Sequence, residues 1–398
     1  MSRVKVNTIS PFTGQNITLG GNAIPSGSNK NLGSETQAWS ELYVSTGSVN
    51  FVAPVTLGQP TVVVASLKAG GEAGVSGPIS GMIFTETNNL RGSFSVGRNN
   101  RASGTASLAV GLSNTSSGNY SYAQGGGTIA SGYSSHAEGG GTIASGSFSH
   151  AEGSSTIALG GSSHAEGLLT TALGDYSHAA GYQTLASGLN SHTRGYQTTS
   201  SGAYSHAEGG NTVALGLQSH AEGQYTLASG QGSHAEGYFT TASDGSHAEG
   251  NTTKALGVSS HTEGQSTVAS GNASHAEGVG TIAIGGGAHA EGWYTTASGQ
   301  GSHAEGLYTI ALGSYQTVVG QYNALNNLNS LFVVGAGANA GTRKDGFSVE
   351  TDGTNAHIVI PANVSSPSNP KEGSMYYDKS TNKLYIYNGV AWKTSSFA

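Results

Sequence analysis

The chain has 398 residues and a net charge of −7; only 9% of its residues are charged, whereas 64 are glycine. Such low charge and high glycine content are not typical of a compact enzyme, and the periodic apolar residues argue against disorder. No cysteine is present, which excludes disulfides, thiolate metal sites and a cysteine nucleophile. The sequence contains no basic patch of the kind that binds nucleic acids. The N-terminal residues Met1–Lys5 show no apolar signal region, and no apolar stretch is long enough to span a bilayer, so we expect a soluble chain that is neither secreted through a visible signal nor anchored in a membrane.

Residues 1–92 carry no repeat. Apolar residues alternate around Thr46-Gly47, at Leu42, Val44, Val49 and Phe51. This alternation predicts β-strands on either side of a turn at that dipeptide.

The pentapeptide Ser-His-Ala-Glu-Gly returns every fourteen residues through the middle of the chain, first as Ser135–Gly139. One step, from Ser233 to Ser246, is a residue shorter, beside Asp244. A repeat this short and regular predicts a stack of coils in which each coil contacts only its neighbours.

Each repeat also holds a second five-residue piece, such as Thr156–Gly160. Five residues is about the length of a strand, and glycine closes each piece, so we expect two short strands and two tight corners per coil. Side chains alternate along a strand, which places serine or threonine and alanine on one face and histidine and glutamate on the other. We expect the small face inside a narrow roll. Because such a core buries little apolar area, we also expect self-association.

From Ser93 to Gly320, the Ser-x-Ala-x-Gly frame resembles the β-roll head of trimeric autotransporter adhesins, and its Ser-His-Ala-Glu-Gly form is similar to heads in bacteriophage tail fibres. The resemblance implies an all-β fold: a left-handed parallel β-roll solenoid of about fourteen-residue coils, homotrimeric, with small β modules at both ends. It implies an N-terminal virion-docking segment at 1–92, a roll at 93–320, a closing β segment at 321–361 and a C-terminal β-hairpin tip at 362–398. In this family the two larger positions of the strand face the trimer axis; here they are histidine and glutamate instead of aliphatic residues.

The two segments after the roll also have strand patterns. In the closing segment, Leu331–Gly335 and Gly346–Val349 are expected strands. In the tip, Asn388-Gly389 predicts a hairpin turn. The tip carries a candidate receptor surface, with core packing as the alternative role for the same aromatics: Tyr376, Tyr377, Tyr385, Tyr387 and Trp392.

Thirteen of the fourteen histidines occupy position two of the repeat. We interpret them with the glutamates as a structural ladder of imidazole–carboxylate hydrogen bonds, in preference to a metal site, because nothing singles out one coil. We expect no cofactor and no catalytic residue. Pairing of histidine with glutamate across chains would make trimer stability depend on pH. The ladder comprises His136, Glu138, His150, Glu152, His164, Glu166, His206, Glu208, His220, Glu222, His234, Glu236, His303 and Glu305.

Two further features interrupt or decorate the repeat. Ala180 and Arg194 break the glutamate column in adjacent coils, either as charge compensation or as drift. Aromatic residues that follow the strand-ending glycine suggest a sugar- or surface-binding stripe, with packing at the corner of the roll as the alternative. They are Tyr182, Tyr196, Tyr225, Tyr238, Phe239, Trp293, Tyr294 and Tyr308.

Together with the repeat, the resemblance to tail-fibre heads implies a non-enzymatic virion structural protein, a phage tail fibre that positions or mediates attachment to the host surface. Its expected partners are two further copies of itself, other tail or baseplate proteins, and a host cell-surface glycan or protein. The alternatives are the head of a bacterial surface adhesin, a polysaccharide-degrading tailspike, and a passive fibre with no receptor role.

Overall fold

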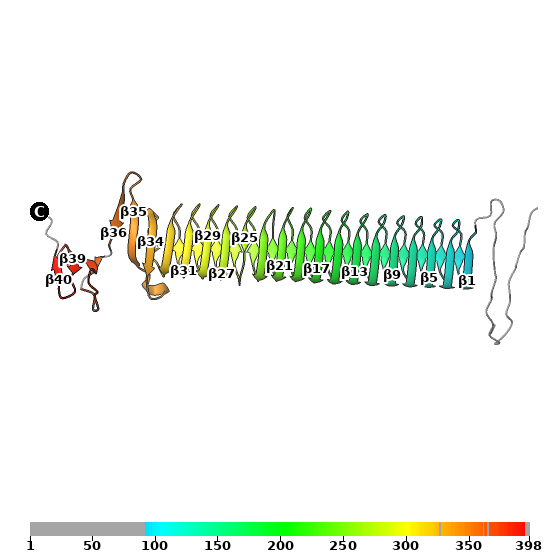
Figure 1. Ribbon diagram of the computed structural model, residues 1–398, viewed down its shortest axis with the longest axis horizontal. Helices are drawn as coiled ribbons and strands as arrows, with labels where there is room; N and C mark the ends of the chain where they lie inside the picture. The colour runs from blue at the N-terminus through cyan, green and yellow to red at the C-terminus, as the bar shows by residue number, and fades with distance from the viewer. Residues whose placement is uncertain (1–91, 326–327, 361, 364–365, 395–398) are drawn as a thin grey trace, which may run out of the picture. The chain divides into compact units, whose positions relative to one another are not determined.

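The computed structural model describes residues 92–398 apart from 326–327, 361, 364–365 and 395–398. The strands expected around Thr46-Gly47 lie outside the described residues. From Phe94 onward the chain winds through about 17 coils of roughly fourteen residues, which stack in one column (Figure 1). The parallel β-solenoid predicted from the repeat is therefore confirmed.

Each full coil holds one long and one short strand. The long strands span five residues except β25, and they are β1 (Phe94–Arg98), β3 (Leu108–Leu112), β5 (Tyr122–Gly126), β7 (His136–Gly140), β9 (His150–Ser154), β11 (His164–Leu168), β13 (His178–Tyr182), β15 (His192–Tyr196), β17 (His206–Gly210), β19 (His220–Gln224), β21 (His234–Tyr238), β23 (His247–Asn251), β25 (His261–Thr262), β27 (His275–Val279), β29 (His289–Trp293), β31 (His303–Leu307) and β33 (Thr317–Gln321).

The short strands span two residues each. They are β2 (Arg101–Ala102), β4 (Thr115–Ser116), β6 (Ile129–Ala130), β8 (Ile143–Ala144), β10 (Ile157–Ala158), β12 (Thr171–Ala172), β14 (Leu185–Ala186), β16 (Thr199–Ser200), β18 (Val213–Ala214), β20 (Leu227–Ala228), β22 (Thr241–Ala242), β24 (Lys254–Ala255), β26 (Val268–Ala269), β28 (Ile282–Ala283), β30 (Thr296–Ala297) and β32 (Ile310–Ala311). The second piece of the repeat was expected to form a strand of about five residues, but only two of its residues do so.

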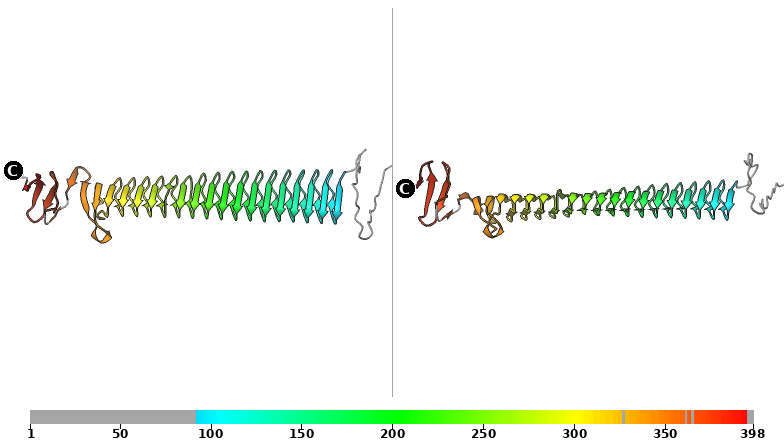
Figure 2. Two further views of the ribbon diagram at one scale, coloured as in Figure 1. Left: turned by 60° about the horizontal axis from the view of Figure 1, so that its bottom comes forward. Right: turned by 90° about the horizontal axis from the view of Figure 1, so that it is seen from below.

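Long strands pair only with long strands and short with short, so two parallel sheets run along the stack (Figure 2). Every residue lies opposite the same repeat position of the next coil, as in His150↔His164 and Ala151↔Ala165. This register brings identical side chains into continuous columns along the roll.

Alanine columns from the two sheets meet inside the roll. Ala137 of a long strand and Ala144 of a short strand have no exposed surface and belong to one buried cluster. Serine and threonine at position one are buried beside them, as at Ser135 and Thr142. The expectation that the small face points inward is confirmed.

Glycine is required where neighbouring coils approach each other. A Cβ on Gly139 would lie 2.0 Å from the carbonyl oxygen of Gly153, and the residue has a φ of +109°. The corners themselves mostly use other residues in the left-handed region, such as Phe148 at φ 58° and Tyr176 at φ 57°. The expectation that glycine makes the turns is therefore only partly right, because most glycines provide close approach.

Serine hydroxyls fasten one corner of the coil. Ser149 Oγ donates to the carbonyl oxygen of Gly146 at 2.7 Å, and the same bond recurs through the roll. In the shortened coil, Ser246 Oγ donates instead to Ser243 O and Ala255 O. This corner is one residue shorter than in the other coils, and the strands keep their register. The pairing of β21 with β23 therefore still places His234 opposite His247.

The solenoid changes character after β33. β34 (Ser330–Ala336) still pairs in parallel with β33, but β35 (Asp345–Thr351) and β36 (Ala356–Val359) add antiparallel strands, with the short 3₁₀ helix η1 (Ala340–Thr342) between β34 and β35. Buried Val318 and Val333 take the place of the alanines here.

The C-terminal residues form a separate four-stranded sheet of β37 (Ala362–Asn363), β38 (Met375–Asp378), β39 (Lys383–Tyr387) and β40 (Trp392–Thr394). β39 and β40 are antiparallel, with Tyr387 opposite Trp392, and Gly389 has a φ of +88°. The hairpin predicted at Asn388-Gly389 is confirmed.

The close approach of neighbouring coils at Gly139 predicts that alanine substitutions at two adjacent glycines differ sharply in their effect on stability. Gly139→Ala should lower the free energy of unfolding by about 2–4 kcal/mol, because the new Cβ meets backbone at a strained φ. The matched control is Gly140→Ala, whose Cβ has nothing within 4 Å, with an expected change below about 1 kcal/mol. Denaturant unfolding followed by circular dichroism measures both; equal losses would contradict the close-approach argument.

Candidate functional site

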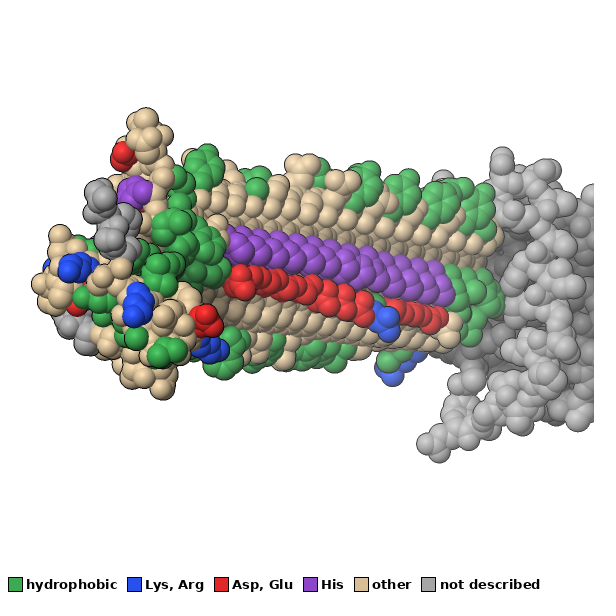
Figure 3. Space-filling model, turned by 60° about the vertical axis from the view of Figure 1, so that its left-hand side comes forward, with side chains coloured by type: hydrophobic (Ala, Val, Ile, Leu, Met, Phe, Trp, Pro, Cys, Tyr) green, Lys and Arg blue, Asp and Glu red, His purple; other side chains and the backbone are tan. Residues whose placement is uncertain are grey.

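The most distinctive surface of the roll is a double column of histidine and glutamate on the long-strand sheet. Within each strand the alanine between them points inward, so both larger side chains point outward. Figure 3 shows the two columns as adjacent stripes along the roll. All fourteen predicted ladder residues lie on this face, which we call the His–Glu column; it runs from His136 on β7 to Glu305 on β31.

The imidazole rings of the column stack on one another. His136 and His150 have ring centroids 4.6 Å apart with planes 3° from parallel, and His289 and His303 are 4.9 Å apart at 5°. Tyr122 continues the stack at its first end, 4.8 Å from His136. In-register pairing enforces this spacing, because the distance between paired strands is about 4.8 Å.

His136 and His234 do not make the imidazole–carboxylate hydrogen bonds that the ladder interpretation predicted, although each lies close to a glutamate. The distance from His136 Nε2 to the carboxylate of Glu138 is 3.5 Å, and from His234 Nε2 to Glu236 it is 3.8 Å. Both Nε2 atoms are buried and have no hydrogen-bond partner among the described residues. Because these side chains are about one-third to one-half exposed, each histidine–glutamate contact adds little to stability even when the imidazole is protonated.

Some carboxylates lie between two coils. One oxygen of Glu152 is 3.9 Å from His150 Nε2, and the other is 3.8 Å from His164 Nε2. Glu291 is placed in the same way between His289 and His303, at 4.0 Å and 3.6 Å. These contacts lie within one chain, so pairing across chains stays a prediction.

Burial and the proximity of like groups shift the pKa values of side chains in the His–Glu column. Desolvation, followed by the charge of neighbouring histidines, lowers the pKa of His164, and the same causes act at His136, His192, His234 and His275. These imidazoles therefore favour the neutral form at neutral pH. Desolvation and a hydrogen bond with Glu166 raise the pKa of the Glu152 carboxyl.

Ala180 and Arg194 interrupt the glutamate column, as the sequence predicted. Here the stack is disturbed: His192 and His206 are turned 71° from parallel, with their Nδ1 atoms 3.2 Å apart. The carboxylates on the preceding coils, Ala180 and Arg194 line a groove of about 530 Å³. This is the one stretch of the His–Glu column, within the described residues, where imidazoles continue without carboxylates.

Aromatic residues gather at both corners of the roll. At the corner noted from the sequence, Tyr294 stacks on Tyr308 at 4.9 Å, and Trp293 is 59% exposed. The opposite corner carries exposed aromatics that were not predicted from the sequence: Tyr120, Tyr133, Phe148, Tyr176, Tyr204 and Tyr315. The repeat pattern could have identified them, because each lies one or two residues before position one of the repeat.

The C-terminal aromatics pack against one another. Tyr376 is buried, stacks on Tyr385 at 5.1 Å and meets Trp392 edge-on at 4.7 Å. The structure thus places Tyr376 in the core of the small sheet, which corrects its assignment to a receptor surface. Tyr377, Tyr385, Tyr387 and Trp392 are half-buried and retain exposed surface.

The repeat region is similar to the YadA head domain repeat, whose two-copy family model matches residues 123–149, 151–177, 165–191, 194–219, 221–243, 263–288, 276–292 and 290–315. These segments cover less than half of the chain. The roll is therefore an adhesin-like β-roll repeat, as its resemblance implied. A comparison with curated proteins finds no match. Across the part of the chain described here, no helix has the length and apolar character to cross a membrane.

The lowered histidine pKa values predict that acid weakens the fold. As the pH falls through about 6.5, unfolded chains take up protons that the folded stack does not, so the free energy of unfolding decreases. We expect the Tm to drop by about 5 °C or more between pH 7.5 and pH 5.5. Calorimetry at fixed ionic strength measures this change.

A matched pair of variants assigns the effect to the stack. Replacing the five shifted histidines with glutamine, at His136, His164, His192, His234 and His275, should flatten the pH profile. His357→Gln on β36, outside the His–Glu column, should leave it unchanged. A wild-type Tm that is constant over this range would contradict the prediction.

Proposed function

We propose that this chain is a non-enzymatic, homotrimeric fibre protein of a bacteriophage tail, in which the roll is a stiff spacer that positions a host-binding tip. Residues 1–92 would bind other tail or baseplate proteins on the virion. The observation that carries the proposal is the unbroken, in-register stack of nearly identical coils from β1 to β33. Such an array supplies length and stiffness, because each coil repeats the contacts of the last.

The distribution of apolar side chains supports an assembly of several copies. Inside the roll are mainly alanine, serine and threonine, which bury little apolar area. Outside it, Leu159, Leu215 and Ile284 on the short-strand side are 45–49% exposed. Other copies of the chain would cover such surface, and the similarity to the YadA head domain repeat favours three.

The small C-terminal sheet is the proposed contact with a host glycan or protein. Its half-buried aromatics offer flat, amphipathic rings that suit sugar and protein surfaces. Three copies on one trimer would raise avidity even when each contact is weak.

The roll favours this function over catalysis. Serine, histidine and glutamate recur in coil after coil, whereas an active site is usually a single constellation built from several elements. The proposal is therefore distinct from a polysaccharide-degrading tailspike, which would release new reducing ends from host polysaccharide.

The second candidate is the head of a bacterial surface adhesin, favoured by the same similarity to the YadA head domain repeat. Both candidates use the roll as a displayed rod, and they differ in what carries it. Antibodies against the purified protein locate it in the organism that encodes it.

We expect immunogold label on the tails of phage particles released from that organism, and none on the surface of uninduced cells. The control is antiserum from which the specific antibodies have been removed by adsorption on the pure protein. Label confined to the cell envelope would refute the phage assignment and establish the adhesin alternative.

A further inference from the structure

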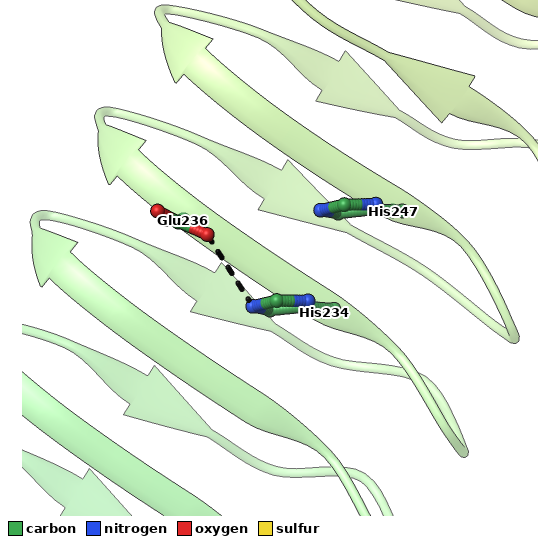
Figure 4. Close-up of side chains that lie close together, drawn as sticks. All are labelled: His234, Glu236 and His247. Atoms are coloured by element: carbon green, nitrogen blue, oxygen red, sulfur yellow. Dashed lines mark ion pairs between the residues drawn. The ribbon is translucent and has the colours of Figure 1, made fainter.

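Donor atoms of neighbouring coils converge along the His–Glu column. A ring nitrogen of His234, a carboxylate oxygen of Glu236 and a ring nitrogen of His247 all lie within 4.8 Å of one another (Figure 4). We infer that the His–Glu column binds divalent transition-metal ions such as Zn²⁺, each held by two imidazoles of adjacent coils and the carboxylate between them. The same grouping recurs at His247, Glu249 and His261, and at His275, Glu277 and His289.

The separations suit a shared ion better than a direct contact. His234 Nε2 lies 3.8 Å from the Glu236 carboxylate, which is too long for a hydrogen bond. A tetrahedral Zn²⁺ with ligands at about 2.0–2.2 Å separates those ligands by about 3.3–3.6 Å. The Nε2 atoms of His234 and His247 are buried and have no hydrogen-bond partner among the described residues, so their ligating capacity is unused within the chain.

The two imidazoles need only a small adjustment to share an ion. Their rings are 1° from parallel with centroids 4.6 Å apart. Both side chains lie on the outer face and are more than one-third exposed, so rotation about their side-chain bonds can bring the nitrogen atoms together. The in-register pairing of β21 with β23 holds the two backbones at the required spacing.

The donor set selects the kind of ion. Two imidazoles and one carboxylate suit Zn²⁺, Ni²⁺ or Cu²⁺, whereas Mg²⁺ and Ca²⁺ prefer sites made of oxygen. The fourth position is available to water or to a group from another copy. This inference concerns one chain's own side chains and does not depend on the proposed function.

The arrangement limits the stoichiometry. An imidazole Nε2 binds one ion, so thirteen column histidines taken in pairs give at most six sites per chain. His192 contributes to none of them, because Ala180 and Arg194 replace the carboxylates on either side of it. The chain therefore contains a natural control: an imidazole in the same stack without a neighbouring carboxylate in its own or the preceding coil.

Equilibrium dialysis of the untagged, chelator-washed full-length protein against Zn²⁺, with metal analysis of both compartments, tests the inference at pH 7.5. We expect about six ions per chain, and at least tenfold weaker binding of Mg²⁺ and Ca²⁺. Removing alternate imidazoles should leave about two ions, and His192→Gln should change nothing. The alternate variant combines His220→Gln, His247→Gln, His275→Gln and His303→Gln.

A carboxylate variant separates this site from a simple row of histidines. Changing the glutamates of β17 to β31 and Glu263 to glutamine keeps every imidazole and should also leave about two ions, with circular dichroism confirming an intact fold. The inference would be overturned if the protein bound no stoichiometric Zn²⁺. It would also be overturned if His192→Gln lost as many ions as the alternate variant, or if the carboxylate variant bound the full number of ions. The carboxylate variant combines substitutions at Glu208, Glu222, Glu236, Glu249, Glu263, Glu277, Glu291 and Glu305.

Discussion

The structure depends on the close approach of backbone between successive coils. At Gly139 and at Gly132, any Cβ would lie 1.9–2.0 Å from a carbonyl oxygen of the next coil. Hydrogen bonding between paired strands fixes the rise from coil to coil, and these glycine columns make that rise possible at the strand ends. The narrow interior then admits only small side chains, which is why alanine, serine and threonine recur inside the roll.

A fixed interior leaves the outer positions to carry the differences between coils. In-register stacking turns each outer position into a column, so one choice of residue is multiplied along the roll. Histidine and glutamate give a face that is polar and rich in imidazole, while leucine and isoleucine give the short-strand side an apolar surface. A roll with so little apolar area inside and so much outside suits a subunit of an assembly.

Much of the fold followed from the sequence, because period, alternation and small residues at fixed positions constrain a β-solenoid strongly. The repeat predicted the coil, the inward alanines and the columns of identical residues, and Asn388-Gly389 predicted its hairpin. The two-residue length of the short strands was missed, because corner geometry takes up the rest of that piece. The corners were misjudged because residues such as Phe148 adopt φ values normally favoured by glycine. Spacing placed His136 beside Glu138, but it could not give the 3.5 Å between His136 Nε2 and the Glu138 carboxylate.

The mass of the protein in solution tests the central claim that the roll is stable as part of a homotrimer. Light scattering coupled to size-exclusion chromatography gives that mass independently of shape. For a homotrimeric rod we expect a single species of three chains of 39.8 kDa each, eluting early for its mass. A folded monomer of 39.8 kDa would contradict it, because the alanine core would then be sufficient for one chain and the outer columns would face solvent.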